Sequence, residues 1–274
     1  MNKNRLITSS IMIAAVWAAI VYDWLFMTFI LVLTTAGLYE FFYLIKKKGI
    51  PIYSYTGILL GILIPFSTFF RFEPTKGWEL LFIVLVLLMI FLMQFMRKEN
   101  INAIVGISTT LFGVLYVSWF LSFLIKIRYL LPGWEGIHLV SFIIVVTKLG
   151  DIGALLVGSQ WGRHPLFPRV SPKKTIEGSI GSFIFSIIGA IVCQSWLPEE
   201  ISFNLVDIIL IGAFFGGFLG QLGDMSESLI KRDCNVKDSG KALPGLGGIL
   251  DVIDSMLFSA PAFYFFISAV LSRS

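Results

Sequence analysis

The chain has 274 residues, of which 57% are hydrophobic and only 14% charged, with a formal net charge of +4. An ordinary soluble domain has about 25% charged residues, so this composition argues against one and indicates a membrane protein. The mean hydropathy of +0.87 points the same way. Two cysteines and two histidines, in no metal-ligand spacing, give little support to a disulfide framework or a histidine metal site. The positive charge fits a basic face beside anionic lipid headgroups, and we expect no nucleic-acid partner.

Nine apolar runs follow one another along the chain. A hydrocarbon core roughly 30 Å thick needs about 20 mainly apolar residues in a helix. Backbone groups in lipid must be hydrogen-bonded within the segment, and no alternating pattern of barrel strands occurs, so the runs should be helices. The predicted fold is therefore all-α, a polytopic integral membrane protein with about nine transmembrane helices. The predicted spans are 6–22, 24–45, 54–70, 79–96, 101–125, 137–157, 178–196, 205–223 and 246–270.

The lysines and arginines indicate the orientation, because cytoplasmic loops carry most of them. With the N-terminus inside, 15 of the 21 lie on the inner side and five on the outer side, while Lys148 lies within a span. The sequence therefore predicts a cytoplasmic N-terminus.

The character of the chain changes near residue 130. The spans before it hold almost no ionisable residue except Glu40, for which the sequence favours a pair with Lys46 or Lys47 at the membrane interface. We expect residues 1–130 to be packing and lipid-facing membrane helices. Residues 131–274 should be the catalytic half of what is predicted to be one continuous membrane domain.

Ionisable residues enter the spans of this second half. Lys148 and Asp151 lie one turn apart in the sixth span. A charge at the centre of a lone helix costs about 2.5 to 3.5 kcal/mol, so such a pair normally faces a cavity or another helix. Mutual neutralisation and a functional role are both open for this pair. Gly212, Gly216 and Gly220 have the small-xxx-small spacing that favours close helix packing.

The first long cytoplasmic loop, predicted at 158–178, combines hydroxyl and ammonium donors. Pro168 and Pro172 keep it out of helix. Donors near a helix start suit phosphate oxygens, since the helix N-terminus adds partial positive charge. The sequence therefore favours anion binding here over a purely topological role. The residues concerned are Ser171, Lys173, Lys174 and Thr175, with Glu177 as their acidic partner.

Charges of both signs crowd the second long loop, predicted at 224–245, and the helix that follows. Carboxylate oxygens suit Mg²⁺, and lysines and arginines neutralise phosphate charge, so the pattern predicts a site for a polyphosphate and a hard cation. It is not a Walker A loop, because Gly240 and Lys241 are followed by Ala242. The acidic residues are Asp224, Glu227, Asp233, Asp238, Asp251 and Asp254, and the basic residues are Lys231, Arg232, Lys237 and Lys241.

One stretch of the second half resembles a known protein family. Residues 228–255 read SLIKRDCNVKDSGKALPGLGGILDVIDS, which is similar to the signature of the phosphatidate cytidylyltransferases, also called CDP-diacylglycerol synthases. The Gly223-Asp224 pair and the loop 171–178 also resemble that family. Two positions depart from it, since Leu246 and Val252 stand where the family usually has His and Arg. The missing Arg removes one bidentate phosphate donor, which neighbouring basic residues have to replace.

The resemblance implies an activity, its partners and a site. Members transfer a cytidylyl group from CTP to phosphatidic acid, releasing diphosphate and forming CDP-diacylglycerol for phospholipid biosynthesis. It also implies Mg²⁺ as cofactor and a cytoplasm-facing site in a bacterial inner membrane; a second, monovalent cation and a homodimer stay open. Carried over, the catalytic residues are Asp224, Asp251, Lys231, Arg232, Lys237 and Asp238; the cation ligands are Asp224, Asp251 and Asp254; the substrate contacts are Ser171, Lys173, Lys174, Thr175, Glu177, Lys241 and Asp151.

Two other functions stay open at this point. A CTP-dependent polyprenol or lipid kinase would release CDP instead of diphosphate. A membrane transporter would line an ion path with Lys148, Asp151, Asp224 and Asp251. The charges gather at one face while five apolar spans lack them, which argues against a path through the membrane.

Overall fold

The computed structural model describes residues 14–72, 78–98, 100–198, 203–240, 242–243 and 247–273. Among these residues, six helices are long and apolar enough to cross a membrane. Two further apolar helices, Ser54–Phe69 and Ile176–Val192, are shorter. The chain is therefore an integral membrane protein built of α-helices, as the sequence predicts.

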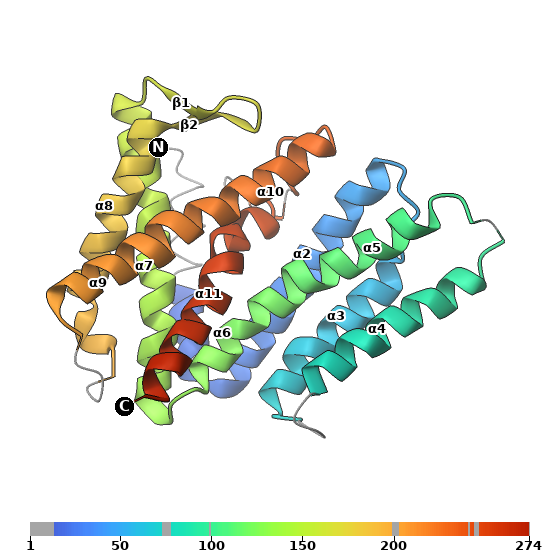
Figure 1. The fold of residues 1–274 in the computed structure, drawn as a ribbon, viewed down its shortest axis with the longest axis horizontal. Helices are drawn as coiled ribbons and strands as arrows, with labels where there is room; N and C mark the ends of the chain where they lie inside the picture. Colours follow the sequence, from blue (N-terminus) through green and yellow to red (C-terminus); the bar gives the residue numbers. More distant parts are fainter. Residues whose placement is uncertain are drawn as a thin grey trace. The chain divides into compact units, whose positions relative to one another are not determined.

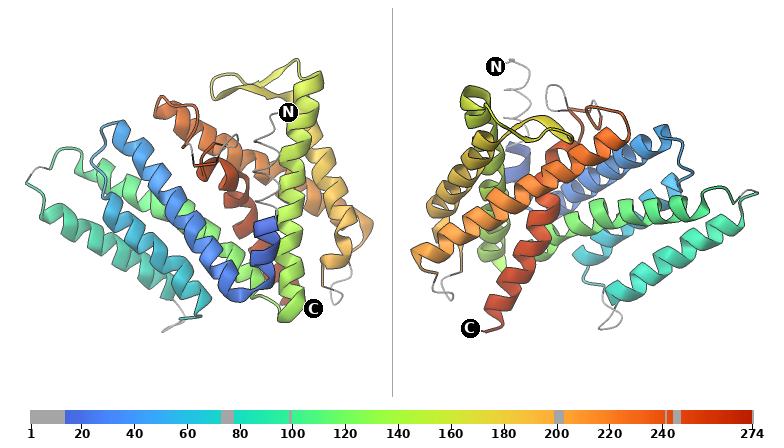
Figure 2. Two further views of the ribbon diagram at one scale, coloured as in Figure 1. Left: turned by 180° about the vertical axis from the view of Figure 1, so that it is seen from behind. Right: turned by 45° about the horizontal axis from the view of Figure 1, so that its top comes forward.

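Two compact units make up the chain (Figure 1, Figure 2). The first consists of Met1–Ile125 with Cys234–Leu250, and the second of Lys126–Asp233 with Asp251–Ser274. The segment 234–250, which carries much of the family signature, therefore packs with the N-terminal helices. The division of roles between 1–130 and 131–274 stays a prediction.

The first unit consists of helices packed around an apolar core. Residues 14–21 are helical. The helices that follow are α2 (Asp23–Lys47), α3 (Ser54–Phe69), α4 (Trp78–Phe95), α5 (Ala103–Gly113), the π-helical η1 (Val114–Trp119) and α6 (Phe120–Arg128). The last three form one span, Ala103–Arg128, which ends in the second unit. One cluster of the core is formed by Tyr53, Leu60, Val86, Ile90 and Ile107.

Glu40 is buried within α2 and does not pair with Lys46 or Lys47, so that expectation is wrong. Its carboxylate instead accepts hydrogen bonds from the segment 234–250. Both lysines are exposed at the end of the helix, and the Lys47 ammonium lies 4.5 Å from the centre of the Tyr43 ring. Their closeness in the sequence favoured the two lysines as ion-pair partners of Glu40, but long side chains at a helix end turn to solvent.

The second unit is built from helices and one short hairpin. The elements are α7 (Gly133–Trp161), β1 (Pro165–Phe167), β2 (Ser171–Thr175), α8 (Ile176–Val192), η2 (Gln194–Trp196), α9 (Leu205–Ile211), the π-helical η3 (Gly212–Gly220), α10 (Gln221–Asp233) and α11 (Leu250–Leu271). Within the predicted loop 158–178, β1 and β2 pair antiparallel, with Pro165 opposite Thr175 and Phe167 opposite Ser171. This hairpin is an addition to the helical prediction.

The eighth span extends beyond its predicted end at residue 223. α9, η3 and α10 form one continuous helix, Leu205–Asp233, so the charged residues from Asp224 to Asp233 are helical and not part of a loop. Glu227 and Lys231 stand at i, i+4, where opposite charges stabilise a helix. The apolar pattern could not reveal this extension because the helix continues into polar and charged residues there.

Glycines allow α8 and η3 to pack closely, as the small-xxx-small spacing predicts. A Cβ atom at Gly212 would lie 2.9 Å from the Cβ of Ala190, and one at Gly216 would lie 2.6 Å from the Ser186 hydroxyl oxygen. Both distances are too short for a larger residue without movement of the helices. The packing interpretation is confirmed for Gly212 and Gly216.

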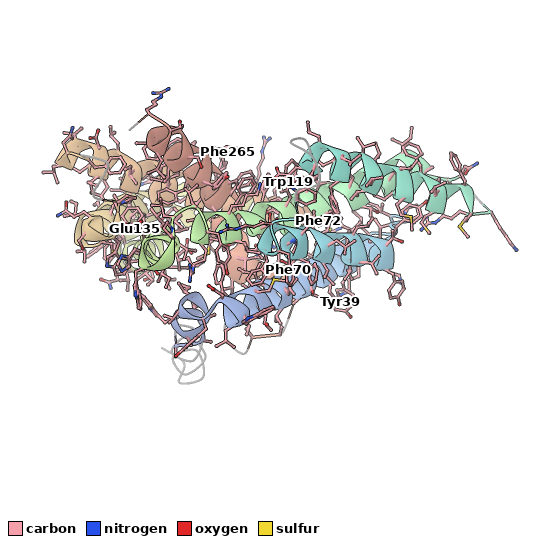
Figure 3. All side chains as sticks on the ribbon, turned by 90° about the horizontal axis from the view of Figure 1, so that it is seen from below. Tyr39, Phe70, Phe72, Trp119, Glu135 and Phe265 are labelled. Atoms are coloured by element: carbon pink, nitrogen blue, oxygen red, sulfur yellow. The ribbon has the colours of Figure 1, made fainter. Side chains whose placement is uncertain are left out.

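Large apolar side chains lie on the outside of both units. Tyr39, Phe70 and Phe72 are exposed in the first, and Phe265 is exposed in the second (Figure 3). Exposed apolar surface on this scale is typical of a protein whose surroundings are lipid. The ionisable groups described below are therefore set apart from the rest of a mostly apolar protein.

Candidate active site

The site in the second unit begins where α10 contacts α11. A Cβ atom at Gly223 would lie only 2.2 Å from the carbonyl oxygen of Asp254, so a glycine is required for this approach of the two backbones. The next residue, Asp224, is thereby placed beside the first turns of α11. The glycine of the family-like pair Gly223-Asp224 is thus explained by the close approach of the two helices.

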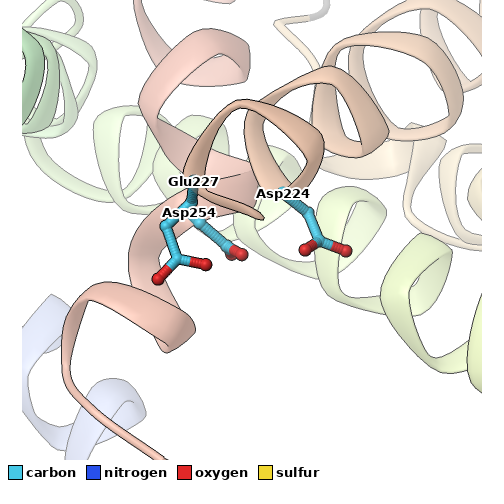
Figure 4. Close-up of side chains that lie close together, drawn as sticks. All are labelled: Asp224, Glu227 and Asp254. Carbon is cyan, nitrogen blue, oxygen red and sulfur yellow. The ribbon is translucent and has the colours of Figure 1, made fainter. Parts of the chain in front are cut away.

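Three carboxylates converge at this contact. Asp224 and Glu227 come from adjacent turns of α10, and Asp254 comes from α11 (Figure 4). One oxygen atom from each lies within 4.8 Å of the others. Glu227 and Asp254 are buried, and among the described residues no lysine or arginine lies within ion-pair distance of Asp254. Buried carboxylates this close repel one another unless one of them is protonated or a cation lies between them.

Lys231 joins two acidic residues of neighbouring helices. Its ammonium group contacts the Glu227 carboxylate one turn earlier in α10 and lies 2.5 Å from the Asp251 carboxylate of α11. All three side chains are largely buried, with exposed fractions of 10%, 0% and 12% for Lys231, Glu227 and Asp251. Asp251, predicted as a cation ligand, therefore pairs with Lys231 as Glu227 does, and Glu227 lies in addition with Asp224 and Asp254.

A second network ties α7 to α11. The Lys148 ammonium donates to the Asp151 carboxylate, the Ser255 hydroxyl and the Val252 carbonyl oxygen, each at 2.8 Å. The Ser255 hydroxyl donates in turn to Asp151. Lys148 and Asp151 do neutralise each other, and they also fix the helix that carries Asp251 and Asp254. The side chain of Val252 takes no part, because only its carbonyl oxygen is used.

The hairpin brings a lysine to Asp224. The Lys174 ammonium lies 2.7 Å from the Asp224 carboxylate. The Nε of Arg232 donates to the carbonyl oxygen of Val170 at 3.3 Å, so the end of α10 contacts the turn of the hairpin. Lysine and arginine side chains here can neutralise phosphate oxygens.

A cavity of about 290 Å³ lies beside Asp224. Both charged groups and apolar side chains line it, a combination that suits a ligand with a phosphate and a hydrocarbon portion. The charged residues are Asp151, Lys173, Lys174 and Asp224, and the apolar ones are Ala154, Leu155 and Leu166.

Thr175 and Glu177 hold the hairpin on α8. The Thr175 hydroxyl accepts a hydrogen bond from the Gly178 N–H at 3.1 Å and so caps the helix. Glu177 accepts from the backbone N–H groups of Arg163 and His164 at 3.0 and 3.2 Å, and its other oxygen lies 2.6 Å from the His164 ring. These bonds, that from Arg163 first, lower the pKa of Glu177 from 4.5 to about 2. Both residues were predicted to contact substrate, which stays a prediction.

Glu177→Gln should loosen the hairpin while leaving the helices folded. The amide keeps one acceptor oxygen but loses the charge that strengthens the bonds to Arg163 and His164. We expect faster cleavage by a protease within residues 163–175, with Glu135→Gln, at the exposed start of α7, as the matched control. Because the folded pKa is lowered, the contribution of wild-type Glu177 is fully present above about pH 4.5 and is lost as the pH falls through about 2. Equal cleavage of the two variants at pH 7 would contradict the assignment.

The remaining predicted residues lie elsewhere. Lys237 and Asp238 belong to the segment 234–250 of the first unit, and their role in catalysis stays a prediction. Lys241 and Leu246 lie outside the described residues. Glu227 is one of the acidic residues of the predicted second loop but was not predicted as a ligand. Its spacing of three from Asp224 would have indicated a shared face, had the segment been expected to be helical.

Comparison with known proteins identifies the family. A family model described as "Cytidylyltransferase family" matches residues 3–270 of the chain. The chain belongs to this cytidylyltransferase family. The resemblance inferred from the signature residues is confirmed, and it extends over both units of the cytidylyltransferase chain.

Named relatives match the cytidylyltransferase chain over nearly its whole length. The phosphatidate cytidylyltransferase of Bacillus subtilis (strain 168) is 30% identical, with 97% of each chain covered. That of Synechocystis sp. is 31% identical, with 99% of this chain and 98% of the relative covered. The phosphatidate cytidylyltransferase of Staphylococcus saprophyticus is 44% identical over a shorter part, 46% of this chain and 48% of the relative.

Proposed function

We propose that the chain is a phosphatidate cytidylyltransferase, which converts CTP and phosphatidic acid to CDP-diacylglycerol and diphosphate in phospholipid biosynthesis. The match to two phosphatidate cytidylyltransferases over nearly the whole of both chains carries the proposal. The local chemistry supports it, because buried carboxylates and lysines adjoin a cavity that is partly charged and partly apolar. A lipid substrate with a phosphate headgroup needs both kinds of surface.

The reaction needs no covalent intermediate on the protein. An oxygen of the lipid phosphate attacks the α-phosphorus of CTP, the bond from that phosphorus to the diphosphate oxygen breaks, and diphosphate leaves with the electron pair. Charge on the phosphoryl oxygens is neutralised by fixed cations, for which Lys174, Lys231 and Arg232 are candidates. Lys173 lines the cavity and can hold either phosphate. Anchored lysines also align the two substrates.

The residues of this site fit a divalent cation. Oxygen ligands are the kind that Mg²⁺ prefers, and one oxygen from each of Asp224, Glu227 and Asp254 lies within 4.8 Å of the others. The Lys231 ammonium contacts one oxygen of the buried Glu227, so this carboxylate belongs to the ion pair as well as to the proposed cation site. When bound, Mg²⁺ would supply charge that neutralises the phosphates of CTP. We propose Asp224, Glu227 and Asp254 as its ligands, with Asp251 as the alternative that the sequence favoured.

The membrane topology is a further part of the proposal. Nine spans, a cytoplasmic N-terminus and a site that opens to the cytoplasm of a bacterial inner membrane would give CTP access from water and phosphatidic acid access from lipid. The excess of lysine and arginine in the expected inner loops supports this orientation. Reporter fusions after residues 98, 130 and 273 would test the sidedness, and mass measurement in detergent would test for a homodimer.

An isotope experiment tests the function. Purified protein receives phosphatidic acid, Mg²⁺ and CTP labelled at either the α- or the γ-phosphate. Cytidylyl transfer puts the α label, but not the γ label, into the lipid. A lipid kinase would put the γ label there, and label in neither case would leave the proposed function without support.

A further inference from the structure

Glu40 accepts three long-range hydrogen bonds within the first unit. One of its oxygens accepts hydrogen bonds from the Ser239 hydroxyl at 3.0 Å and the Leu250 N–H at 2.9 Å. The other accepts from the Ile249 N–H at 3.0 Å. The side chain is buried, and up to 210 residues separate it from these partners in the sequence. A buried carboxylate in an apolar helix is costly unless such donors satisfy it.

The carboxylate of Glu40 acts as the cap of another helix. α11 begins at Leu250, and the first N–H groups of a helix have no partner within it. Glu40 supplies the acceptor for two N–H groups at this start, and a negative charge is favourable at a helix N-terminus. The start of α11 at Leu250 is therefore held by a residue of α2.

Two glycines of the signature segment make room for this carboxylate. A Cβ atom at Gly240 would lie 2.2 Å from one oxygen of Glu40, and one at Gly248 would lie 2.4 Å from the other. Residues 239–240 and 248–250 thus lie around the same side chain. The glycines and Glu40 form one arrangement, which we call the Glu40 clasp: Glu40, Ser239, Gly240, Gly248, Ile249 and Leu250.

We propose that Glu40 is a positioning residue for cytidylyl transfer, through the Glu40 clasp that fixes the end of the signature segment and the start of α11. The proposal rests on the proposed function. Asp251 follows Leu250 directly, and Asp254 lies in the next turn of the same helix. A helix whose first turn is fixed keeps both carboxylates in place. If the first turn frayed, Asp251 would be the first of the two to lose its position. Small displacements of reacting groups have large effects on rate.

The clasp can be tested without any assay of activity. Cys234 is buried at the start of the same segment, and Cys193 can be replaced by Ser to leave a single thiol. Glu40→Ala should raise the rate at which a maleimide labels Cys234 by about tenfold, because the segment opens more often. Glu40→Gln keeps one acceptor oxygen and should give an intermediate rate. Glu79→Ala, a glutamate in the first turn of α4, should label at the wild-type rate.

Kinetics of the same variants test the catalytic half of the proposal. Glu40→Ala should lower kcat per folded enzyme by about 10²-fold, with much smaller changes in the KM values of CTP and phosphatidic acid. Glu40→Gln should recover part of kcat, and Ser239→Ala, which removes one of the three bonds, should show the same pattern in weaker form even if Glu40→Ala does not fold. A residue with only a structural role would lower the amount of folded enzyme and leave kcat unchanged.

Two results would overturn the proposal. If Cys234 is labelled at the wild-type rate in Glu40→Ala, the clasp does not hold the segment. If labelling is faster but kcat is unchanged in Glu40→Ala and Glu40→Gln, the clasp has no role in catalysis. A wild-type protein that transfers no label from α-labelled CTP would overturn the proposed function and the catalytic role with it, while the labelling rates would still decide the clasp.

Discussion

Asp224→Asn should lower kcat for cytidylyl transfer by at least about 10²-fold while the protein still inserts and folds. Loss of a residue that only supports a metal ligand typically costs 10- to 100-fold, and loss of a ligand charge should cost more. Asn keeps the shape of Asp224, so the contact of α10 with α11 at Gly223 is preserved. The measurement is kcat at saturating CTP over a titration of Mg²⁺. The concentration of Mg²⁺ at half-maximal activity should rise as well.

A matched control for this variant is Asp207→Asn. Asp207 is a half-buried aspartate of the capping box at the start of α9 in the same unit, and it lies outside the carboxylate cluster. It should retain near-wild-type kcat and the same Mg²⁺ dependence. Near-normal kcat and Mg²⁺ dependence in Asp224→Asn would rule out Asp224 as a cation ligand.

The same titration separates the two proposed ligand sets. If Glu227 binds the cation with Asp224 and Asp254, Glu227→Gln should shift the Mg²⁺ midpoint strongly. Asp251→Asn should then lower kcat chiefly through the loss of its ion pair with Lys231, with a smaller shift of the midpoint. The opposite ranking would favour the set Asp224, Asp251 and Asp254.

The sequence predicted the positions of the membrane helices well because each depends on a local property, a long apolar run. The predicted spans 24–45, 54–70 and 79–96 agree with α2, α3 and α4 to within a few residues. Much of span 6–22 lies outside the described residues, and only residues 14–21 are seen as helix. The total of nine spans and the sidedness therefore stay predictions.

The site was predicted in part, for physical reasons that differ between residues. The signature pointed to Asp224, Lys231 and Asp254 by residue type and order. It did not reveal the alignment of Glu227 with Asp224, because that depends on α10 continuing past the apolar run. Nor could it reveal the partners of Glu40, since a contact over about two hundred residues depends on tertiary packing and leaves no local pattern.

Lys231→Met should be the most destabilising of the substitutions considered. Lys231 is buried between Glu227 and Asp251, and its removal brings two carboxylates of like charge together without the ammonium group. Breaking a buried ion pair by removing one partner costs about 3 to 5 kcal/mol. We expect a large fall in the midpoint of thermal unfolding in detergent, followed by circular dichroism, together with loss of cytidylyl transfer. Lys46→Met, at an exposed lysine of α2, should leave both unchanged.

A double variant separates stability from catalysis at this lysine. Lys231→Met with Glu227→Gln restores the balance of charge in the buried cluster, so most of the thermal stability should return. Activity should not return, because the ammonium group near the phosphates and one carboxylate of the proposed metal site are both lost. If the double variant regains activity along with stability, Lys231 and Glu227 serve the fold alone and the chemistry lies with the other residues of the cluster. Recovery of neither would show that the coupling extends beyond this pair, to Asp251.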